Sequence, residues 1–210
     1  MHKSAYKSCV DFHKTYSDYF PQDCHVVEIG SQNVNGSLRP IFSQNRYTGV
    51  DFAQGNGVDI VLTDPYKFPI PDESVDVVVS SSCFEHSEMF WITFLEAMRI
   101  LKPTGLFYMN APANWGAYHL YPVDCWRFLP DSGNALVSWA KRNGINAMLL
   151  ESYLTHPDED VWVDFIAVFL KEASHNQIYP FRILDSKTDF FNGHKNDLSS
   201  ILNFVEYLKS

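Results

Sequence analysis

Acidic side chains stand in or at the end of two apolar runs near the start of the chain. Glu28 lies in the run of residues 26–29, two positions before Gly30, and Asp51 ends the run of residues 46–51. A carboxylate at the end of a buried strand costs free energy unless it is hydrogen-bonded or faces a ligand. In nucleotide-binding α/β domains, an acid about twenty residues after the glycine turn accepts hydrogen bonds from ribose hydroxyls. Asp51 is therefore predicted to hold a ribose.

The turn after the first run lacks the glycines of a dinucleotide site. A G-x-G-x-x-G pattern that begins at Gly30 needs a glycine at position 32, where Gln32 stands. An acid before the turn, without phosphate-binding glycines, suits a ligand that has no phosphate. S-adenosylmethionine is such a ligand, and its cationic amino and sulfonium groups favour nearby carboxylates. The alternative is an ordinary strand, turn and helix in which Glu28 only caps the turn.

Two histidines are candidate general bases, because imidazole titrates near neutrality. His86 follows the apolar run of residues 75–80, and His119 lies in a loop beyond the run of residues 106–110. His119 is the favoured base, since its loop is dense in aromatic and charged side chains. Four of these suit a hydroxylated substrate such as a sugar: Tyr118, Tyr121, Asp124 and Arg127. In the alternative reading, His86 fixes its loop by bonding to backbone, and Arg127 pairs with Asp124 in a loop that plugs the core.

The elements that must position these residues alternate between apolar runs and helical patterns, which predicts an α/β fold with a mostly parallel sheet. Strands are expected over residues 26–29, 46–51, 58–62, 75–80, 106–110, 147–153 and 162–170, and helices over residues 3–19, 34–42, 88–101 and 134–141. The link before residues 58–62 is too short for a helical crossover, so that strand should be short or peripheral. The acidic linker 156–160 predicts an antiparallel, hairpin-like return. The first helix either covers a sheet edge or closes over a ligand.

The C-terminal part is expected to form an extension. Residues 1–171 should form the main domain, and residues 172–210 an extension packed on it. Asp197 can cap a last helix whose apolar face includes Ile201 and Phe204. That face packs either on the core or on a second copy of the chain, so a homodimer is one of the two expectations.

Composition narrows the functional classes. The 210 residues are 46% apolar and 15% aromatic, which is typical of a globular chain with a sizeable core. The formal charge of -9 argues against a nucleic-acid partner. No apolar run reaches the length of a membrane span and no signal peptide opens the chain, so no membrane partner is expected. The four cysteines lack a C-x-x-C spacing and are predicted to be reduced thiols of a cytosolic protein, with no metal site.

Ordered segments of the chain resemble the motifs of class I S-adenosylmethionine-dependent methyltransferases, close to the type 11 group. These segments are 26–30 (VVEIG), 47–51 (YTGVD), 68–78 (FPIPDESVDVV), 84–86 (FEH) and 99–105 (RILKPTG). The resemblance spans roughly residues 24–130. It implies a Rossmann-like sheet of seven strands in the order 3-2-1-4-5-7-6, with strand seven antiparallel. Residues 121–131 are similar to a segment in methyltransferases of bacterial glycan and natural-product clusters, which implies a sugar-like or small hydroxylated acceptor.

The resemblance also implies a role for each part of the site. The expected cofactor residues are Glu28, Gly30, Ser31, Asn33, Asp51, Phe52, Asp64, Pro65, Ser81 and Ser82. Glu28 would orient backbone around the methionine amino end, Asp64 and Pro65 would border the adenine, and the serines would line the methionine side. Asp64 could equally form a turn before proline. The expected reaction moves a methyl group from sulfonium to oxygen.

Gln32 stands where the family has its second glycine. Because of this difference, two other functions are considered. One is a non-catalytic module that retains the fold. The other is a nicotinamide-dependent oxidoreductase, against which the missing glycine counts.

Overall fold

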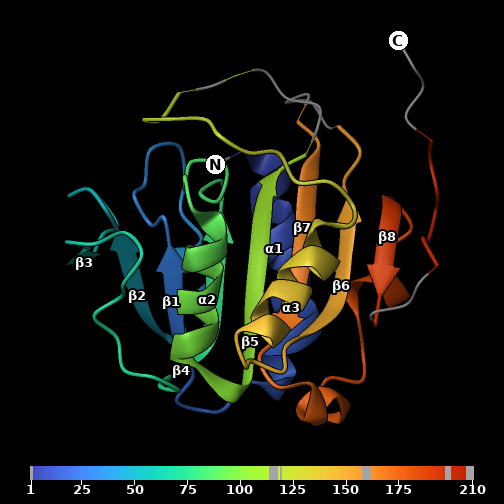
Figure 1. Cartoon of the computed structure of the whole chain (residues 1–210), viewed down its shortest axis with the longest axis horizontal. Helices are drawn as coiled ribbons and strands as arrows, with labels where there is room; N and C mark the ends of the chain where they lie inside the picture. The colour runs from blue at the N-terminus through green and yellow to red at the C-terminus, as the bar shows by residue number, and fades with distance from the viewer. Residues whose placement is uncertain (1, 114–117, 119, 158–161, 197–199, 207–210) are drawn as a thin grey trace.

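A single mixed sheet runs through the molecule in the order β3-β2-β1-β4-β5-β7-β6-β8 (Figure 1). The computed structural model describes residues 2–113, 118, 120–157, 162–196 and 200–206. In this part of the chain the strands are β1 (His25–Ile29), β2 (Arg46–Asp51), β3 (Ile60–Val61), β4 (Val75–Ser81), β5 (Leu101–Pro112), β6 (Met148–Leu154), β7 (Asp164–Leu170) and β8 (Phe191–Lys195). Strands β1 to β5 pair in parallel, whereas β7 is antiparallel to both of its neighbours. The class I strand order with its reversed seventh strand is therefore confirmed, and β3 is as short as the sequence predicted.

Helices cover both faces of this sheet. In Figure 1, α2 (Phe90–Ile100) and α3 (Ser132–Arg142) lie in front of the sheet and α1 (Lys3–Tyr16) lies behind it. One buried core contains Phe94 of α2 with Phe107 and Phe169 of the sheet. The other contains Phe12 of α1 with Tyr108. The first helix thus covers a face of the sheet rather than an edge, because its apolar side chains pack over β5 and β7.

The prediction of a helix over residues 34–42 is wrong. Only a 3₁₀ turn, η2 (Arg39–Phe42), forms in this crossover. Gly36 has a φ of 136°, far from a helical value, and the Asn33 side chain accepts a hydrogen bond from its N–H at 2.9 Å. Pro40 has no N–H to continue a helical ladder. Local loop bonds therefore replace the helix on this side of the sheet.

The C-terminal extension contains a strand that the sequence did not predict. After the 3₁₀ turns η3 (Ala173–Ile178) and η4 (Ile183–Asp185), β8 pairs antiparallel with β6 and adds an eighth strand. Residues 200–206 are not helical, and Leu202 forms an antiparallel bridge with Gly193. The Asn192 side chain also bonds both backbone groups of Val205, at 2.8 and 3.0 Å. The prediction of a last helix is thus wrong for the described residues, and its predicted cap, Asp197, lies outside them.

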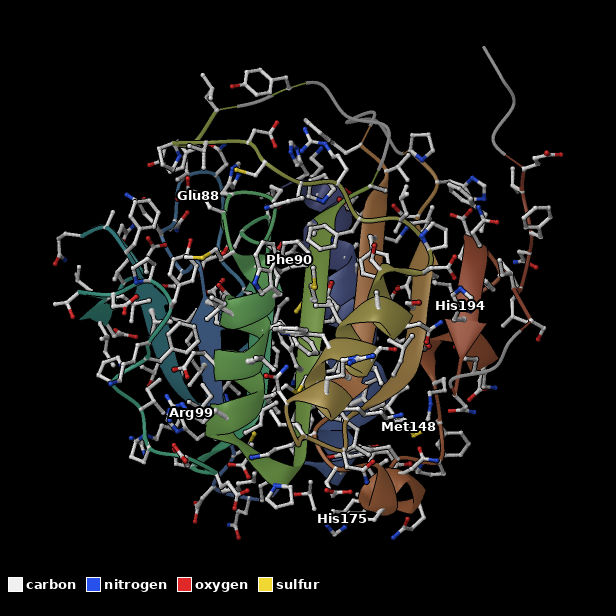
Figure 2. All side chains as sticks on the ribbon, in the orientation of Figure 1. Glu88, Phe90, Arg99, Met148, His175 and His194 are labelled. Atoms are coloured by element: carbon white, nitrogen blue, oxygen red, sulfur yellow. The ribbon has the colours of Figure 1, made fainter. Side chains whose placement is uncertain are left out.

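The fold brings the predicted site residues to one end of the sheet. The parallel strands β1, β2, β4 and β5 end there, and the strand order reverses between β1 and β4, the place where α/β sheets bind ligands. Figure 2 shows Glu88 at this end, above α2, and His175 at the opposite end. Among the helices of the described residues, none has the length and apolar character needed to cross a bilayer.

Candidate functional site

A cavity of about 520 Å³ opens where β1, β2 and β4 end. Its walls come from the loops after these strands, from residues 120–123, and from His2, Trp162 and Asp164. The predicted cofactor residues that line it are Glu28, Gly30, Asp51, Phe52, Pro65, Ser81 and Ser82. Ser31, Asn33 and Asp64 do not border it. The topology therefore gathers most of this predicted set around one space.

Gly30 allows the turn after β1 to approach the loop after β4. Its φ of 77° is unfavourable for other residues. A Cβ placed on it would also lie 2.6 Å from the Cys83 Sγ atom. Any side chain here would push the two walls of the cavity apart, so glycine is required by both conformation and space.

Glu28 is a buried carboxylic acid at the base of the cavity. Its Oε2 atom accepts a hydrogen bond from the Tyr47 hydroxyl at 2.8 Å. Burial raises the pKa of Glu28 to about 7, although the Tyr47 hydrogen bond and the charge of Arg39 oppose this shift. The group therefore titrates near neutrality, and a cationic ligand group beside it would favour the ionised form.

Asp51 is fixed between two loops. Its Oδ2 atom accepts from the Gln32 N–H at 3.0 Å and its Oδ1 atom accepts from the Ala53 N–H at 3.1 Å. Each carboxylate oxygen can accept more than one hydrogen bond, so the group retains capacity for hydroxyls of a ligand. Phe52 follows it on the cavity wall, with 52% of its surface exposed.

Two of the three predicted cofactor residues outside the cavity accept hydrogen bonds from local backbone. Asn33 accepts from Gly36, as described above, and Asp64 Oδ1 accepts from the Tyr66 N–H at 2.9 Å. Ser31 is buried beneath the turn. For Asp64 this is the turn geometry that the sequence left open as the alternative to adenine binding.

The two candidate bases have different outcomes. His119 lies outside the described residues. His86 lines the cavity, and its Nδ1 atom contacts the Val123 carbonyl oxygen. A carbonyl oxygen can only accept, so we assign the proton to Nδ1. The Nε2 atom lies 3.6 Å from Glu85 Oε1. The ring therefore fixes its loop, as the alternative interpretation expects, while it also borders the cavity.

Residues 120–128 form a loop, here called the acceptor loop, that is fastened over the cavity at two places. At one end the Tyr121 hydroxyl lies 3.1 Å from Gln32 Oε1 and donates to it. At the other end the Cys125 and Trp126 N–H groups donate to the Glu85 carbonyl oxygen at 2.8 and 3.1 Å. Gln32 thus contacts the acceptor loop from the position where the sequence lacks a glycine.

Three of the predicted substrate residues do not line the cavity. Tyr118 is 71% exposed. Arg127 and Asp124 form a bidentate ion pair, with Nη1 to Oδ1 at 2.5 Å and Nη2 to Oδ2 at 2.7 Å. This is the pairing that the sequence left open, and Phe128 beside them is part of the buried core. Tyr121 alone of the four borders the cavity.

Several residues that line the cavity were given no role in the site from the sequence. Glu85 stands in the FEH segment, but only its neighbour His86 was assigned a role. His2, Trp162 and Asp164 come from the starts of α1 and β7, far from the motifs. Only the folded topology brings them to the cavity, so no local pattern could have found them.

Comparisons with known proteins agree with this geometry. Residues 28–109 match the family model described as a methyltransferase domain of the type 11 group. No curated protein matches the sequence significantly.

Solved structures share the fold at low sequence identity. The 1,6-didemethyltoxoflavin-N1-methyltransferase of Burkholderia thailandensis, solved with S-adenosylhomocysteine, has a TM-score of 0.60 and 12% identity over 81% of this chain and 80% of that chain. A methyltransferase from Aquifex aeolicus described as S-adenosylmethionine-dependent has a TM-score of 0.50 and 12% identity over 81% of this chain and 99% of that chain. The cyclase SpnF has a TM-score of 0.55 and 13% identity over 79% of this chain and 82% of that chain. Residues 28–109 thus resemble a type 11 methyltransferase domain, and the chain has the fold of class I S-adenosylmethionine-dependent methyltransferases.

Proposed function

We propose that this protein is an S-adenosylmethionine-dependent methyltransferase that methylates a hydroxyl group of a small or sugar-like acceptor. The observation that carries the proposal is the position of Glu28 and Asp51 on one cavity at the ends of β1 and β2. Among the described residues that line this cavity there is no lysine or arginine. Such a site suits a cofactor that carries positive charge and no phosphate.

The residues present fit this cofactor. Asp51 has free acceptor capacity for the ribose hydroxyls, and Phe52 and Pro65 offer apolar surface for the adenine. Ser81 and Ser82 line the end of β4, where the methionine part would lie, and Glu28 sits beneath that end. When bound, S-adenosylmethionine supplies an electrophilic methyl group on its sulfonium.

The chain contributes alignment and proton removal. The acceptor loop would hold the hydroxyl oxygen in line with the carbon–sulfur bond, and such positioning can supply much of the rate enhancement. A base of the chain would take the hydroxyl proton as the methyl group passes from sulfur to oxygen, so that S-adenosylhomocysteine would be the other product. His119 remains the predicted base. If His86 serves instead, its Nε2 atom is the one that accepts the proton, because Nδ1 donates to Val123.

The cellular setting is part of the proposal. We infer a cytosolic enzyme with a small-molecule acceptor. Support comes from the four cysteines, which are unpaired in the structure, as in a reducing compartment.

A methyl-transfer assay tests the proposal. Purified protein is incubated with S-adenosylmethionine labelled in the methyl group and with a panel of hydroxylated acceptors, together with matched amines and thiols. We expect label in an alkali-stable methyl ether, lost in Asp51→Ala and retained in Asp189→Ala, which removes an exposed acid that does not line the cavity. Transfer only to nitrogen, sulfur or carbon would contradict the oxygen acceptor.

A further inference from the structure

Tyr47 and Glu28 form a hydrogen-bonded pair at the base of the cavity. In the parallel pairing of β1 with β2, Tyr47 lies opposite Val26, so its side chain shares one face of the sheet with Glu28, two residues further along β1. The Tyr47 hydroxyl donates to Glu28 Oε2 at 2.8 Å. Glu28 is 6% exposed and borders the cavity, whereas Tyr47 does not border it. We therefore expect Tyr47 to act on a ligand through the carboxyl group of Glu28.

The tyrosine ring is itself fixed in place. The guanidinium carbon of Arg39 lies 4.7 Å from the centroid of the Tyr47 ring, and the ring of Phe42 lies 5.9 Å from it. Arg39 in turn is held by Asp59, with Nη2 to Oδ2 at 2.5 Å. The positive charge nearest the pair is thus engaged elsewhere, and the donor that bonds Glu28 is a neutral hydroxyl.

The surroundings of Glu28 favour a proton on its carboxyl group until a positive ligand arrives. Burial raises the pKa of Glu28 to about 7, and the Tyr47 hydrogen bond is the largest influence that opposes this rise. A positive group of a ligand beside the carboxyl would lower this pKa and favour the ionised form. The other groups that act on it or lie near it are Arg39 and the Leu38 backbone, which favour ionisation, Asp51, which opposes it, and Cys9 of α1 and Cys83 after β4, thiols whose pKa is raised by burial.

We propose that Tyr47 is a positioning residue for the cofactor, whose hydrogen bond prepares Glu28 to ionise when the ammonium group of the methionine part binds, so that binding releases a proton. This inference rests on the proposed function. The proton passes from the carboxyl group to solvent, the ammonium takes its place as the positive partner, and no bond of the cofactor changes. Cofactor affinity should therefore rise with pH and level off above about pH 7, where Glu28 is already ionised in the empty protein.

Tyr47→Phe removes the hydroxyl that favours the ionised carboxylate and keeps the ring. Because hydrogen bonds to charged groups are the strong ones, the affinity should level off about one pH unit higher than in the wild type. We expect binding of S-adenosylhomocysteine roughly fivefold weaker or more at about pH 6.5 and nearly equal at about pH 8.5. A role of Tyr47 in structure alone would weaken binding to the same extent at every pH.

Calorimetry in pairs of buffers with different ionisation enthalpies measures both affinity and the number of protons released. The titrations use S-adenosylhomocysteine and methylthioadenosine, which keeps the adenosine and the sulfur but lacks the ammonium and carboxylate groups. We expect S-adenosylhomocysteine to release protons mainly below about pH 7, and methylthioadenosine to release none. Glu28→Gln should bind S-adenosylhomocysteine more weakly, with no proton release and no dependence on pH between about 5.5 and 8.5.

A second tyrosine provides the matched control. Tyr6 is exposed on α1 and does not border the cavity, so Tyr6→Phe should match the wild type at every pH. Binding of S-adenosylhomocysteine without proton release, equal release with methylthioadenosine, or a loss in Tyr47→Phe that is the same at every pH would overturn the inference.

Failure of S-adenosylhomocysteine to bind at all would contradict the proposed function instead. Carbon NMR of the Glu28 carboxyl group in unloaded protein then tests the pair by itself. We expect the titration midpoint to lie about one pH unit higher in Tyr47→Phe than in the wild type and Tyr6→Phe. An unmoved midpoint in Tyr47→Phe would show that the hydrogen bond does not set the ionisation of Glu28, and the inference would fall.

Discussion

Glu28 and Glu85 are carboxylic acids that the fold buries beside one cavity. Burial raises the pKa of Glu28 to about 7 and that of Glu85 to about 8, from a usual value of 4.5. Between the usual and the raised pKa, the folded chain binds more protons than the unfolded chain. The free energy of unfolding therefore falls as pH rises through this window. Both acids thus cost stability at neutral pH, which is typical of groups kept for ligands.

Glu85→Gln should therefore stabilise the ligand-free protein at high pH. The substitution removes an ionisation whose cost grows up to about pH 8. Each kcal/mol shifts the melting temperature of a chain of this size by about 2–4 °C, so we expect a gain of several degrees at pH 8.5 and almost none at pH 5. Thermal unfolding at both pH values measures this difference. Glu88→Gln serves as the exposed control, and an equal shift at both pH values would show that burial of the charge is not the cause.

Much of the site could be predicted from the type of a residue and its position in an apolar run. Glu28 and Asp51 could be placed from sequence because each stands at the end of an apolar run. Asn33 and Asp64 could not, since short polar side chains in turns readily bond to their own backbone. Gln32 was visible as a departure from the glycine pattern, but its bond to Tyr121 depends on a loop that is distant in sequence.

At the scale of elements, the acceptor loop is fastened to both walls of the cavity. The loop after β4 holds it through Glu85 backbone and His86, and Trp126 Nε1 donates to the Ser87 carbonyl oxygen at 3.0 Å. The turn after β1 holds it through the bond between Tyr121 and Gln32. We expect these attachments to slow the release of a ligand bound beneath the loop.

Tyr121→Phe should speed the release of S-adenosylhomocysteine. The substitution removes one exposed hydrogen bond and keeps the ring, so an increase of about three- to tenfold in the dissociation rate is expected. Stopped-flow fluorescence measures the rate. Tyr118→Phe removes the same hydroxyl from an exposed ring outside the cavity. Identical rates in both variants would mean that the bond does not retain the ligand.

Whether a helix or strand could be predicted depends on how local its sequence signal is. The strands were predictable because continuous apolar runs are typical of buried parallel strands. The helix over residues 34–42 was not, because loop bonds around Gly36 and Asn33 compete with it. Strand β8 has the polar sequence FNGHK, which lacks a strand signal. It forms because β6 would otherwise leave an open edge, and edge pairing is a property of the whole sheet.

At the scale of the whole molecule, buried polar groups tie the extension to the sheet. Glu151 of β6 accepts hydrogen bonds from the Tyr16 hydroxyl at 2.5 Å and from the Ile183 and Leu184 N–H groups at 2.8 and 2.9 Å. Arg182, 4% exposed, donates to the Leu150 carbonyl oxygen and to the side chains of neighbouring asparagines. Helix α1, the sheet and residues 172–196 are thereby joined, and we propose that the extension is part of the same domain.

Arg182→Ala should destabilise the entire chain rather than the extension alone. It leaves buried carbonyl and amide oxygens without their donor, and a loss of roughly 3 kcal/mol is expected. Urea unfolding, followed by both far-UV dichroism and tryptophan fluorescence, gives the free energy of unfolding. Arg142→Ala, on the exposed side of α3, should change it little. If the two probes separate, or if both variants are alike, the extension folds independently of the sheet.

The central claim is that the cavity at the ends of β1, β2 and β4 binds S-adenosylmethionine through Asp51. Calorimetric titration of S-adenosylmethionine, S-adenosylhomocysteine and NADH into the wild type and Asp51→Ala tests it most directly. We predict roughly micromolar binding of both sulfur ligands, weakened at least about tenfold by the substitution, and no binding of NADH. Binding of NADH alone, or sulfur-ligand binding that is indifferent to Asp51, would contradict the account.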